Sequence, residues 1–142
     1  IVAYNNAHYG DVSALLSHGR GKTMGDGWET RRRREPGNDW IIIKLATKGL
    51  IKKIEIDTAH FKGNYPDQAS VQVSSFDKNK GLEEVINDSH NWKYILDKSK
   101  LQADNIHNYE VNDTSIEGVT HVRLNIYPDG GVSRLRIFGL KL

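Results

Sequence analysis

The chain of 142 residues contains no cysteine. This absence excludes disulfide scaffolds, cysteine-ligated zinc, iron–sulfur clusters and thiol nucleophiles. The chain also lacks a dominant charge, because 20 basic and 18 acidic side chains leave a net charge of +2. Long hydrophobic stretches are missing too, since no apolar run reaches the roughly 18 residues of a spanning helix. We therefore expect no membrane-spanning segment and no secretory leader, and bulk charge indicates no particular partner.

Short stretches in which apolar and polar residues alternate dominate the sequence, and such alternation predicts β-strands. The predicted strands cover residues 40–45, 53–58, 70–74, 92–96, 109–111, 121–126 and 134–138. Helical signals are weak: residues 11–16 indicate a short capped turn, and residues 82–86 are ambiguous. The glycine-rich, polar residues 1–35 predict long loops packed on the strands. The pattern predicts an all-β fold, an antiparallel jelly-roll β-sandwich that forms a single domain over residues 1–142.

The segment from His18 to Thr23 is rich in glycine and basic residues, as phosphate-binding loops are. Such a loop requires a glycine five residues before the Gly-Lys pair, and Leu16 occupies that place. The spacing therefore excludes a phosphate-binding loop of this kind. The backbone and basic side chains of the segment could still bind an anion.

Four consecutive arginines, Arg31 to Arg34, form a second basic segment between Glu29 and Glu35. Three interpretations stay open for it: a solvated face, nucleic-acid binding, or guanidinium groups that hold a small carboxylate by bidentate hydrogen bonds. Nucleic-acid binding requires more basic residues on one face together with stacking aromatics, and the two glutamates partly neutralise the run. We therefore expect no nucleic acid as a partner.

The six histidines do not form a zinc-binding pattern, but one of them has informative neighbours. His60 follows Asp57 by three residues, just beyond a predicted strand, and Asn64 lies in the next loop. These side chains could converge at one rim of the sandwich, where a carboxylate can fix a histidine tautomer and raise its basicity. The alternative, which the spacing alone favours, is that His60 caps a turn and Asp57 accepts hydrogen bonds from loop amides.

Two predicted strands carry polar residues on one face. His121, Arg123 and Asn125 share a face of one strand, and Arg134 and Arg136 share a face of another. Such faces most often meet water. If the two strands were neighbours, their polar faces would form a platform suited to a small anion.

Four segments distributed over the chain carry a more specific signal. They are residues 21–32 (Gly-Lys-Thr-Met-Gly-Asp-Gly-Trp-Glu-Thr-Arg-Arg), 37–40 (Gly-Asn-Asp-Trp), 57–64 (Asp-Thr-Ala-His-Phe-Lys-Gly-Asn) and 128–136 (Pro-Asp-Gly-Gly-Val-Ser-Arg-Leu-Arg). In this order and at these separations they resemble the allantoicase family. The resemblance extends from Tyr4 to Gly139, which is nearly the whole chain.

The resemblance implies a jelly-roll sandwich of the galactose-binding type, in agreement with the alternation. It also implies an enzyme, an allantoicase that hydrolyses allantoate to ureidoglycolate and urea in purine breakdown. Known members tend to form homo-oligomers, and some need a divalent metal such as manganese. The absence of cysteine fits a reducing compartment, so we expect the cytoplasm as the location, with the peroxisome as the alternative. The competing interpretation is a catalytically inactive relative, or a module of this fold that only binds a ligand.

Members of the family usually carry two homologous repeats, and this chain has the length of one. The Gly-Arg-Gly segment 19–21 and the His60-Phe61 pair resemble the second, C-terminal repeat. We therefore expect the chain to correspond to that repeat, with the other repeat as its partner in the complete enzyme. If the active site is shared between repeats, a single repeat is inactive.

The chemistry of allantoate suggests roles for residues of the matching segments. Its carboxylate calls for a guanidinium fork, its ureido groups for paired donors and acceptors, and the release of urea for an acid and a base. The candidates for acid and base are Glu29, Asp57 and His60. The candidates for substrate binding are Arg31, Arg32, Arg134 and Arg136 at the carboxylate, Asn64 and Asp129 at the ureido groups, and Trp28 as either a pocket wall or a core residue. No metal ligand is assigned.

Overall fold

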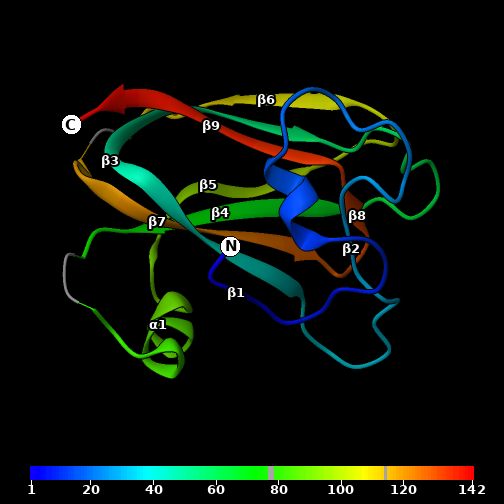
Figure 1. Cartoon of the computed structure of the whole chain (residues 1–142), viewed down its shortest axis with the longest axis horizontal. Helices are drawn as coiled ribbons and strands as arrows, with labels where there is room; N and C mark the ends of the chain where they lie inside the picture. The colour runs from blue at the N-terminus through cyan, green and yellow to red at the C-terminus, as the bar shows by residue number, and fades with distance from the viewer. Residues whose placement is uncertain (77–78, 114) are drawn as a thin grey trace.

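A computed structural model describes residues 1–76, 79–113 and 115–142. Strands dominate it and form a curled sheet with long loops gathered at one end (Figure 1). In chain order the elements are β1 (Ala3–Tyr4), the 3-10 helix η1 (Val12–Leu16), β2 (Trp28–Glu29), β3 (Asp39–Asp57), β4 (Gln68–Ser74), α1 (Leu82–Ser89), β5 (Lys93–Lys100), β6 (Ile106–Glu110), β7 (Val119–Tyr127), β8 (Gly131–Val132) and β9 (Arg134–Lys141). The predicted all-β sandwich is confirmed.

The long strand β3 joins the two layers of the sandwich. Its first half pairs with β7, which continues through β4 to the edge strand β5, whereas its second half pairs with β6 and β9. The prediction of two separate strands, 40–45 and 53–58, is wrong in this respect. Residues 46–52 contain no proline, and a shift of register between Lys44 and Gly49 lets the strand bend without ending.

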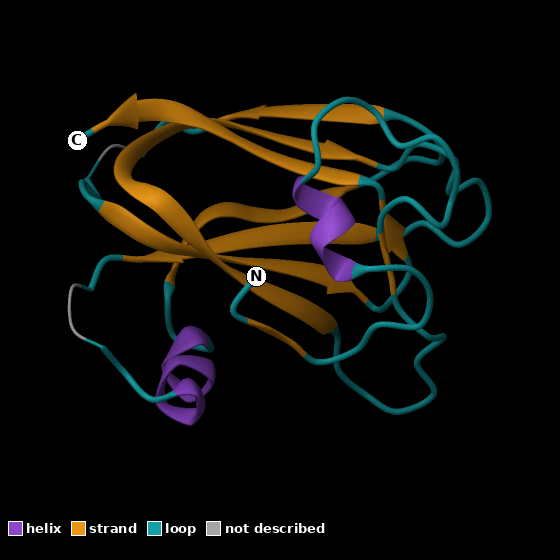
Figure 2. Ribbon diagram, in the orientation of Figure 1, coloured by secondary structure: helices purple, strands orange, loops and turns teal. Residues whose placement is uncertain are grey.

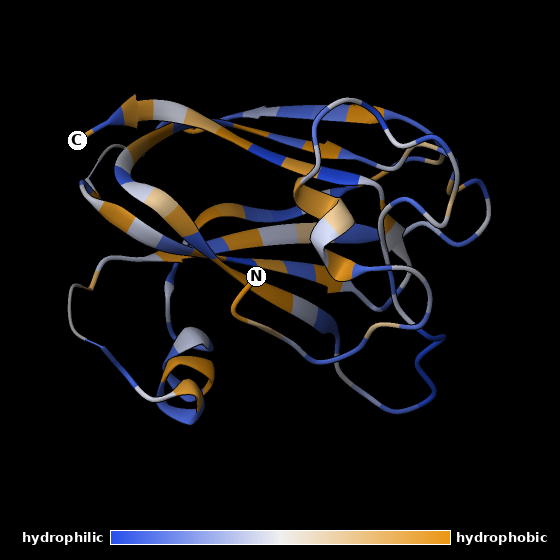
Figure 3. Cartoon of the chain, in the orientation of Figure 1, coloured by the Kyte–Doolittle hydropathy of each residue, from blue (hydrophilic) through white to orange (hydrophobic). Residues whose placement is uncertain are grey.

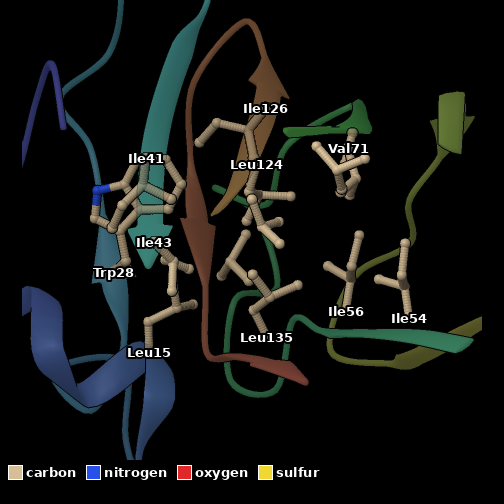
Figure 4. Packing of buried hydrophobic residues seen from close by; sticks show 14 of the residues in the cluster. Leu15, Trp28, Ile41, Ile43, Ile54, Ile56, Val71, Leu124, Ile126 and Leu135 are labelled. Carbon is tan, nitrogen blue, oxygen red and sulfur yellow. The ribbon is translucent and has the colours of Figure 1, made fainter. Parts of the chain in front are cut away.

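Apolar side chains from both layers meet in one core (Figure 4). Ile41 and Ile43 come from the first half of β3, and Ile54 and Ile56 come from its second half. Within each half, alternate residues point to the same face of the strand, and this face is turned towards the core. Leu15 of η1 packs against the same cluster, so the N-terminal segment is tied to the sandwich by buried apolar surface.

The N-terminal loops cover one end of the sandwich, as predicted for residues 1–35 (Figure 2). The predicted capped turn is present, because Asp11 Oδ1 accepts a hydrogen bond from Ser13 N–H at 3.0 Å at the start of η1. Within the part of the chain that the structure describes, neither helix is long and apolar enough to cross a membrane.

The polar face of β7 is covered by protein. His121, Arg123 and Asn125 are all buried, since α1 and the chain beside it lie over this face. Arg123 donates to the Ser89 hydroxyl of α1 at 2.6 Å and to Asn125 Oδ1 at 2.8 Å. The expectation of a solvated face is therefore wrong. The condition for a shared platform is also not met, because β7 lies between β3 and β4 and not beside β9.

Two arginines of β9 hold the glycine-rich loop 17–27 against the sandwich. The buried Arg134 donates to Gly19 O at 3.0 Å, to Asp26 O at 2.8 Å and to Asp26 Oδ1 at 2.9 Å. Arg136 donates to Ser17 O at 3.1 Å and also to Gly19 O. Because this loop leads directly into β2, the two arginines position the strand that carries Glu29.

The carboxylate of Asp26 makes this anchor dependent on pH. The Lys22 N–H and the Arg134 guanidinium lower the pKa of Asp26 below its ordinary value of 3.8. A carboxyl group with a lowered folded-state pKa contributes stability that is complete above the unfolded-state value and is lost as pH falls through the folded-state value. We therefore expect the free energy of unfolding in urea to be lower for Asp26→Asn than for wild type at neutral pH. This difference should shrink below about pH 4, where Asp26 of the wild type becomes protonated.

The matched control is Glu84→Gln, which changes an exposed carboxylate on α1. Its free energy of unfolding should stay close to the wild-type value over the same pH range. A difference between wild type and Asp26→Asn that is constant from neutral pH to about pH 3 would contradict the prediction.

Candidate functional site

The long loops gather at the end of the sandwich that lies on the right in Figure 1. A cleft opens among these loops. Its volume is about 700 Å³, and short stretches far apart in the sequence line it: residues 8–9, 29–30, 32–33, 63–64 and 128–130. Cavities that bind small molecules commonly measure roughly 300–1,000 Å³. The cleft therefore has the size expected for a site that takes a small organic compound.

The short pair of strands β2 and β8 brings two candidate residues together. Glu29 of β2 lies opposite Gly131 of β8. Gly131 N–H donates to Asn64 O at 2.8 Å, so the loop that carries Asn64 lies directly against this pair. The Asn64 amide then donates to Glu29 Oε2 at 2.5 Å. A carboxylate and an amide from two separate motifs thus form one hydrogen-bonded unit.

Asp129 reaches the cleft from the turn between β7 and β8. Its Oδ2 accepts a hydrogen bond from Arg33 N–H at 2.7 Å. The backbone of the neighbouring Gly130 forms three hydrogen bonds with Thr30. Gly130 O accepts from Thr30 N–H at 2.9 Å and from the Thr30 hydroxyl at 3.3 Å, and Gly130 N–H donates to Thr30 Oγ1 at 3.0 Å. Gly130 has a φ of +130°, and a Cβ atom there would lie 2.6 Å from Asn64 O. Glycine is therefore required for this turn to lie beside the Asn64 loop.

The consecutive arginines have different surroundings. Arg33 Nη1 lies 3.0 Å from Oδ1 of the buried Asp39, so this side chain ties the loop to the start of β3. Arg31 is exposed, and its backbone N–H donates to Asn6 Oδ1 at 2.8 Å. Arg32 is exposed and lines the cleft. Of the two arginines in this segment predicted to bind a carboxylate, Arg32 is the one that lines the cleft.

Two residues that no motif indicated complete the lining. His8 N–H donates to Glu29 O at 2.8 Å, and Tyr9 forms an antiparallel bridge with Glu29. Both side chains are exposed, and their rings meet edge to face with centroids 4.2 Å apart. The sequence around His8 and Tyr9 contains no motif that indicates a site. Their position at the cleft depends on the pairing of their backbone with β2, a strand of only two residues.

Asp57 and His60 precede the cleft residue Asn64 by only a few positions in the sequence. Their side chains nevertheless contact groups outside the cleft lining. Asp57 Oδ1 accepts from Ala59 N–H at 2.8 Å and from Arg20 at 3.2 Å. His60 Nε2 lies 2.6 Å from Gly21 O. Asp57 thus accepts from a loop amide, as the alternative interpretation expected. Neither side chain is part of the cleft lining, and their catalytic roles stay predictions.

Three candidates for substrate binding contribute to the fold. Trp28 has no exposed surface, packs in the core shown in Figure 4, and donates Nε1–H to Asn6 O at 2.9 Å. Arg134 and Arg136 direct their donors at the loop 17–27. The candidates that the cleft brings together are Glu29, Arg32, Asn64 and Asp129. The candidates outside its lining are Trp28, Arg31, Asp57, His60, Arg134 and Arg136.

The side chains present do not fit a manganese ion bound by this chain alone. In residues 1–76, 79–113 and 115–142, no group of three or more histidine, aspartate or glutamate side chains is placed to hold a metal ion. The metal that the resemblance implies therefore has no ligand set among these residues.

Comparison with known sequences identifies a protein family. A family model described as the allantoicase repeat matches residues 1–142. Probable allantoicase 1 of Burkholderia mallei is 54% identical over 139 residues, which are 98% of this chain and 41% of that protein. The probable allantoicase of Ralstonia nicotianae is 53% identical over 140 residues, again 98% of this chain and 41% of the relative. The chain thus spans about 41% of the length of these curated relatives.

Solved structures similar to this chain include an allantoicase. Allantoicase from Saccharomyces cerevisiae superposes with a TM-score of 0.81 at 41% identity, over 96% of this chain and 39% of the yeast chain. An F5/8 type C domain from Bacteroides fragilis superposes with a TM-score of 0.70 at 12% identity, over 99% of this chain and 91% of that domain, and so shows the fold alone. The predicted fold class and resemblance are confirmed, and the chain belongs to the allantoicase family.

Proposed function

We propose that this chain supplies a substrate-binding and catalytic cleft of an allantoicase, the enzyme that hydrolyses allantoate to ureidoglycolate and urea. The observation that carries the proposal is the convergence of Glu29, Arg32, Asn64 and Asp129 in one cleft. Relatives named probable allantoicase, at 54% and 53% identity, support the reaction. The complete enzyme includes further polypeptide, for which the family resemblance implies the other repeat. Assembly into a homo-oligomer is a prediction from the same resemblance, and a cytoplasmic or peroxisomal location is a prediction from the sequence.

Recognition of allantoate follows from its functional groups. Its central carbon carries one carboxylate and two ureido groups. The Arg32 guanidinium binds the carboxylate, because its planar fork of donors matches the two oxygens. The Asn64 amide and the Asp129 carboxylate meet the ureido groups, which present both N–H donors and carbonyl acceptors. The hydrogen bond from Arg33 N–H fixes the orientation of Asp129 before substrate arrives.

The hydrolysis needs one base and one acid. Glu29 takes a proton from water as the water oxygen bonds to the central carbon of allantoate. The bond from this carbon to one ureido nitrogen breaks, and a proton donated to that nitrogen by His8 releases urea. The products are ureidoglycolate and urea, so atoms and charge balance. The hydrogen bond from Asn64 holds the Glu29 carboxylate in one orientation for this transfer.

Removal of the Glu29 charge tests the base. The variant Glu29→Gln keeps the size of the side chain but cannot accept a proton, so we expect kcat for urea release to fall by roughly 100-fold or more. The assay uses the protein at its natural full length and allantoate as substrate. Circular dichroism and the melting temperature verify that the variant is folded.

The matched control is Glu84→Gln, the same change on the exposed surface of α1. It should release urea at the wild-type rate. A Glu29→Gln variant whose rate stays within about twofold of wild type would remove Glu29 from the reaction. Wild-type protein that binds allantoate but releases no urea would instead indicate a catalytically inactive relative.

The substitution Arg32→Lys tests the carboxylate contact. Lysine keeps the charge but loses the bidentate fork, and the carboxylate is bound equally in the substrate and in the transition state. We therefore expect KM for allantoate to rise roughly tenfold with a much smaller change in kcat. Arg34→Lys, in an exposed neighbour outside the cleft, is the control and should leave both constants unchanged. Equal KM values for the two variants would contradict the role of Arg32.

A further inference from the structure

Residues 37–40 (Gly-Asn-Asp-Trp) form one of the segments that resemble the family, yet they contribute no side chain to the lining of the cleft. They join the loop after β2 to the start of β3, and this loop is hydrophilic along most of its length (Figure 3). Asp39 is only 1% exposed, although an aspartate is seldom buried unless its charge is paired. The contacts of this buried carboxylate therefore indicate what the segment does.

The charged partner of Asp39 is Arg33, which lies in the same loop. Asp39 Oδ1 accepts a hydrogen bond from Arg33 Nη1 at 3.0 Å, and Arg33 Nη2 donates to Pro36 O at 3.4 Å. Gly37 has a φ of +119°, and a Cβ atom there would lie 2.8 Å from Arg33 Nη2, so glycine leaves room for the guanidinium. Glu35 lies 3.6 Å from Arg33 Nη1, but its side chain is 68% exposed and the pair is screened by solvent. Asp39 is thus the buried charge that holds the Arg33 side chain.

The ion pair between Arg33 and Asp39 is joined through one pair of atoms. Arg33 Nε and Asp39 Oδ2 are buried too, and neither has a hydrogen-bond partner among the protein groups that the structure describes. A bidentate fork would engage both carboxylate oxygens, so the two side chains do not adopt the geometry that would satisfy them best. The position of Arg33 is therefore also determined by its other contacts, among which is its backbone bond to Asp129.

Asp39 holds the turn after β7 from two sides. Its backbone pairs with Ile126 of β7, and its N–H donates to Pro128 O at 3.1 Å. Its side chain holds Arg33, whose N–H donates to Asp129 Oδ2 at 2.7 Å. The backbone of Asp39 thus fixes the start of the turn, and its carboxylate acts through Arg33 on the carboxylate at the tip of the turn.

The bond from Arg33 leaves one oxygen of Asp129 for a ligand. Oδ2 accepts from the Arg33 N–H, whereas no hydrogen bond to Oδ1 occurs within residues 1–76, 79–113 and 115–142. Asp129 is partly exposed and lines the cleft. An ionised carboxylate only accepts hydrogen bonds, so Oδ1 is suited to an N–H donor of a bound compound. A ureido group presents such donors, and a ketone or a carboxylate does not.

We propose that Asp39 is a positioning residue for ureido recognition: through Arg33 it holds Asp129 in the orientation that leaves Oδ1 for a ureido N–H. Asp39 itself lies outside the lining of the cleft and does not touch the substrate. Without the Asp39 charge, the exposed Glu35 is the remaining charged partner of Arg33 among the described residues, so the Arg33 backbone is held less firmly. The inference rests on the proposed function for the identity of the substrate.

Binding of two matched compounds tests the inference by calorimetry on the protein at its natural full length. N-carbamoylglycine carries one carboxylate and one ureido group, and levulinate has the same shape with methylene and methyl groups in place of the two nitrogens. We expect Asp39→Asn to raise Kd for N-carbamoylglycine roughly fivefold, the usual effect of one hydrogen bond, and to leave Kd for levulinate within about twofold. Asp129→Asn should show the same selective loss. The double variant should lose no more than Asp129→Asn alone, because both changes act on one contact.

The matched control is Asp97→Asn, the same change at an exposed position of β5, and it should leave both Kd values unchanged. Arg32→Lys should raise both Kd values, because both compounds carry the carboxylate. Equal losses of both compounds in Asp39→Asn would overturn the inference, since they would indicate a general structural role. Losses in Asp39→Asn and Asp129→Asn that add in the double variant would also overturn it.

A second variant, Arg33→Lys, keeps a cation opposite Asp39 but loses the bond to Pro36 O, so it tests the same connection should Asp39→Asn fail to fold. It should lose the preference for N-carbamoylglycine as well, and KM for allantoate in the same variants gives a second measurement. Wild type that binds N-carbamoylglycine more tightly than levulinate but releases no urea from allantoate would overturn the proposed reaction alone. Wild type that releases urea but shows equal affinity for the two compounds, or binds neither, would overturn the inference alone.

Discussion

The candidate cleft depends on the close approach of Phe61 to the backbone of β8. Phe61 is fully buried, and a Cβ atom at position 131 would overlap its ring. Only glycine at this position lets the loop after Phe61 lie against the β2–β8 pair. Gly131 N–H then binds Asn64 O, and the Asn64 side chain reaches Glu29. Packing of an aromatic ring on a bare backbone thus determines how close two polar groups of the proposed active site come.

Much of the fold could be predicted, because alternation reports which side chains face a core. It predicted β4 and β7 to within two residues at each end, whereas the predicted strand 92–96 covers only the first half of β5. Alternation cannot report what covers the other face of a sheet. The burial of Arg123 depends on Ser89 of α1, which comes from a segment with an ambiguous local pattern. Likewise, the continuity of β3 depends on its pairing with β7 and β9 on the two sides of its bend, and these are contacts between residues distant in the sequence.

The sequence was less informative about the site, and the arginines illustrate why. Arg32 and Arg134 both occur in motifs of the family, and both guanidinium groups suit a carboxylate. In the structure, Arg134 is surrounded by carbonyl groups of a glycine-rich loop and by Asp26, so its donors are already bound. Arg32 lies at the cleft without such enclosure. A sequence motif contains residues needed for folding beside residues needed for binding, and only the partners of each side chain in the structure distinguish the two.

The two ends of the sandwich present different kinds of surface. At the loop end, chain segments from four parts of the sequence are tied together by backbone hydrogen bonds, and polar groups with fixed orientation remain available to a small molecule. At the bend of β3, the strands separate and apolar side chains lie exposed among lysines. A site for a small substrate needs a rigid polar cleft, whereas association needs apolar area. The single bent strand β3 has both of its ends near the cleft and its bend at the far side, so one continuous strand places these two different surfaces at opposite ends of the sandwich.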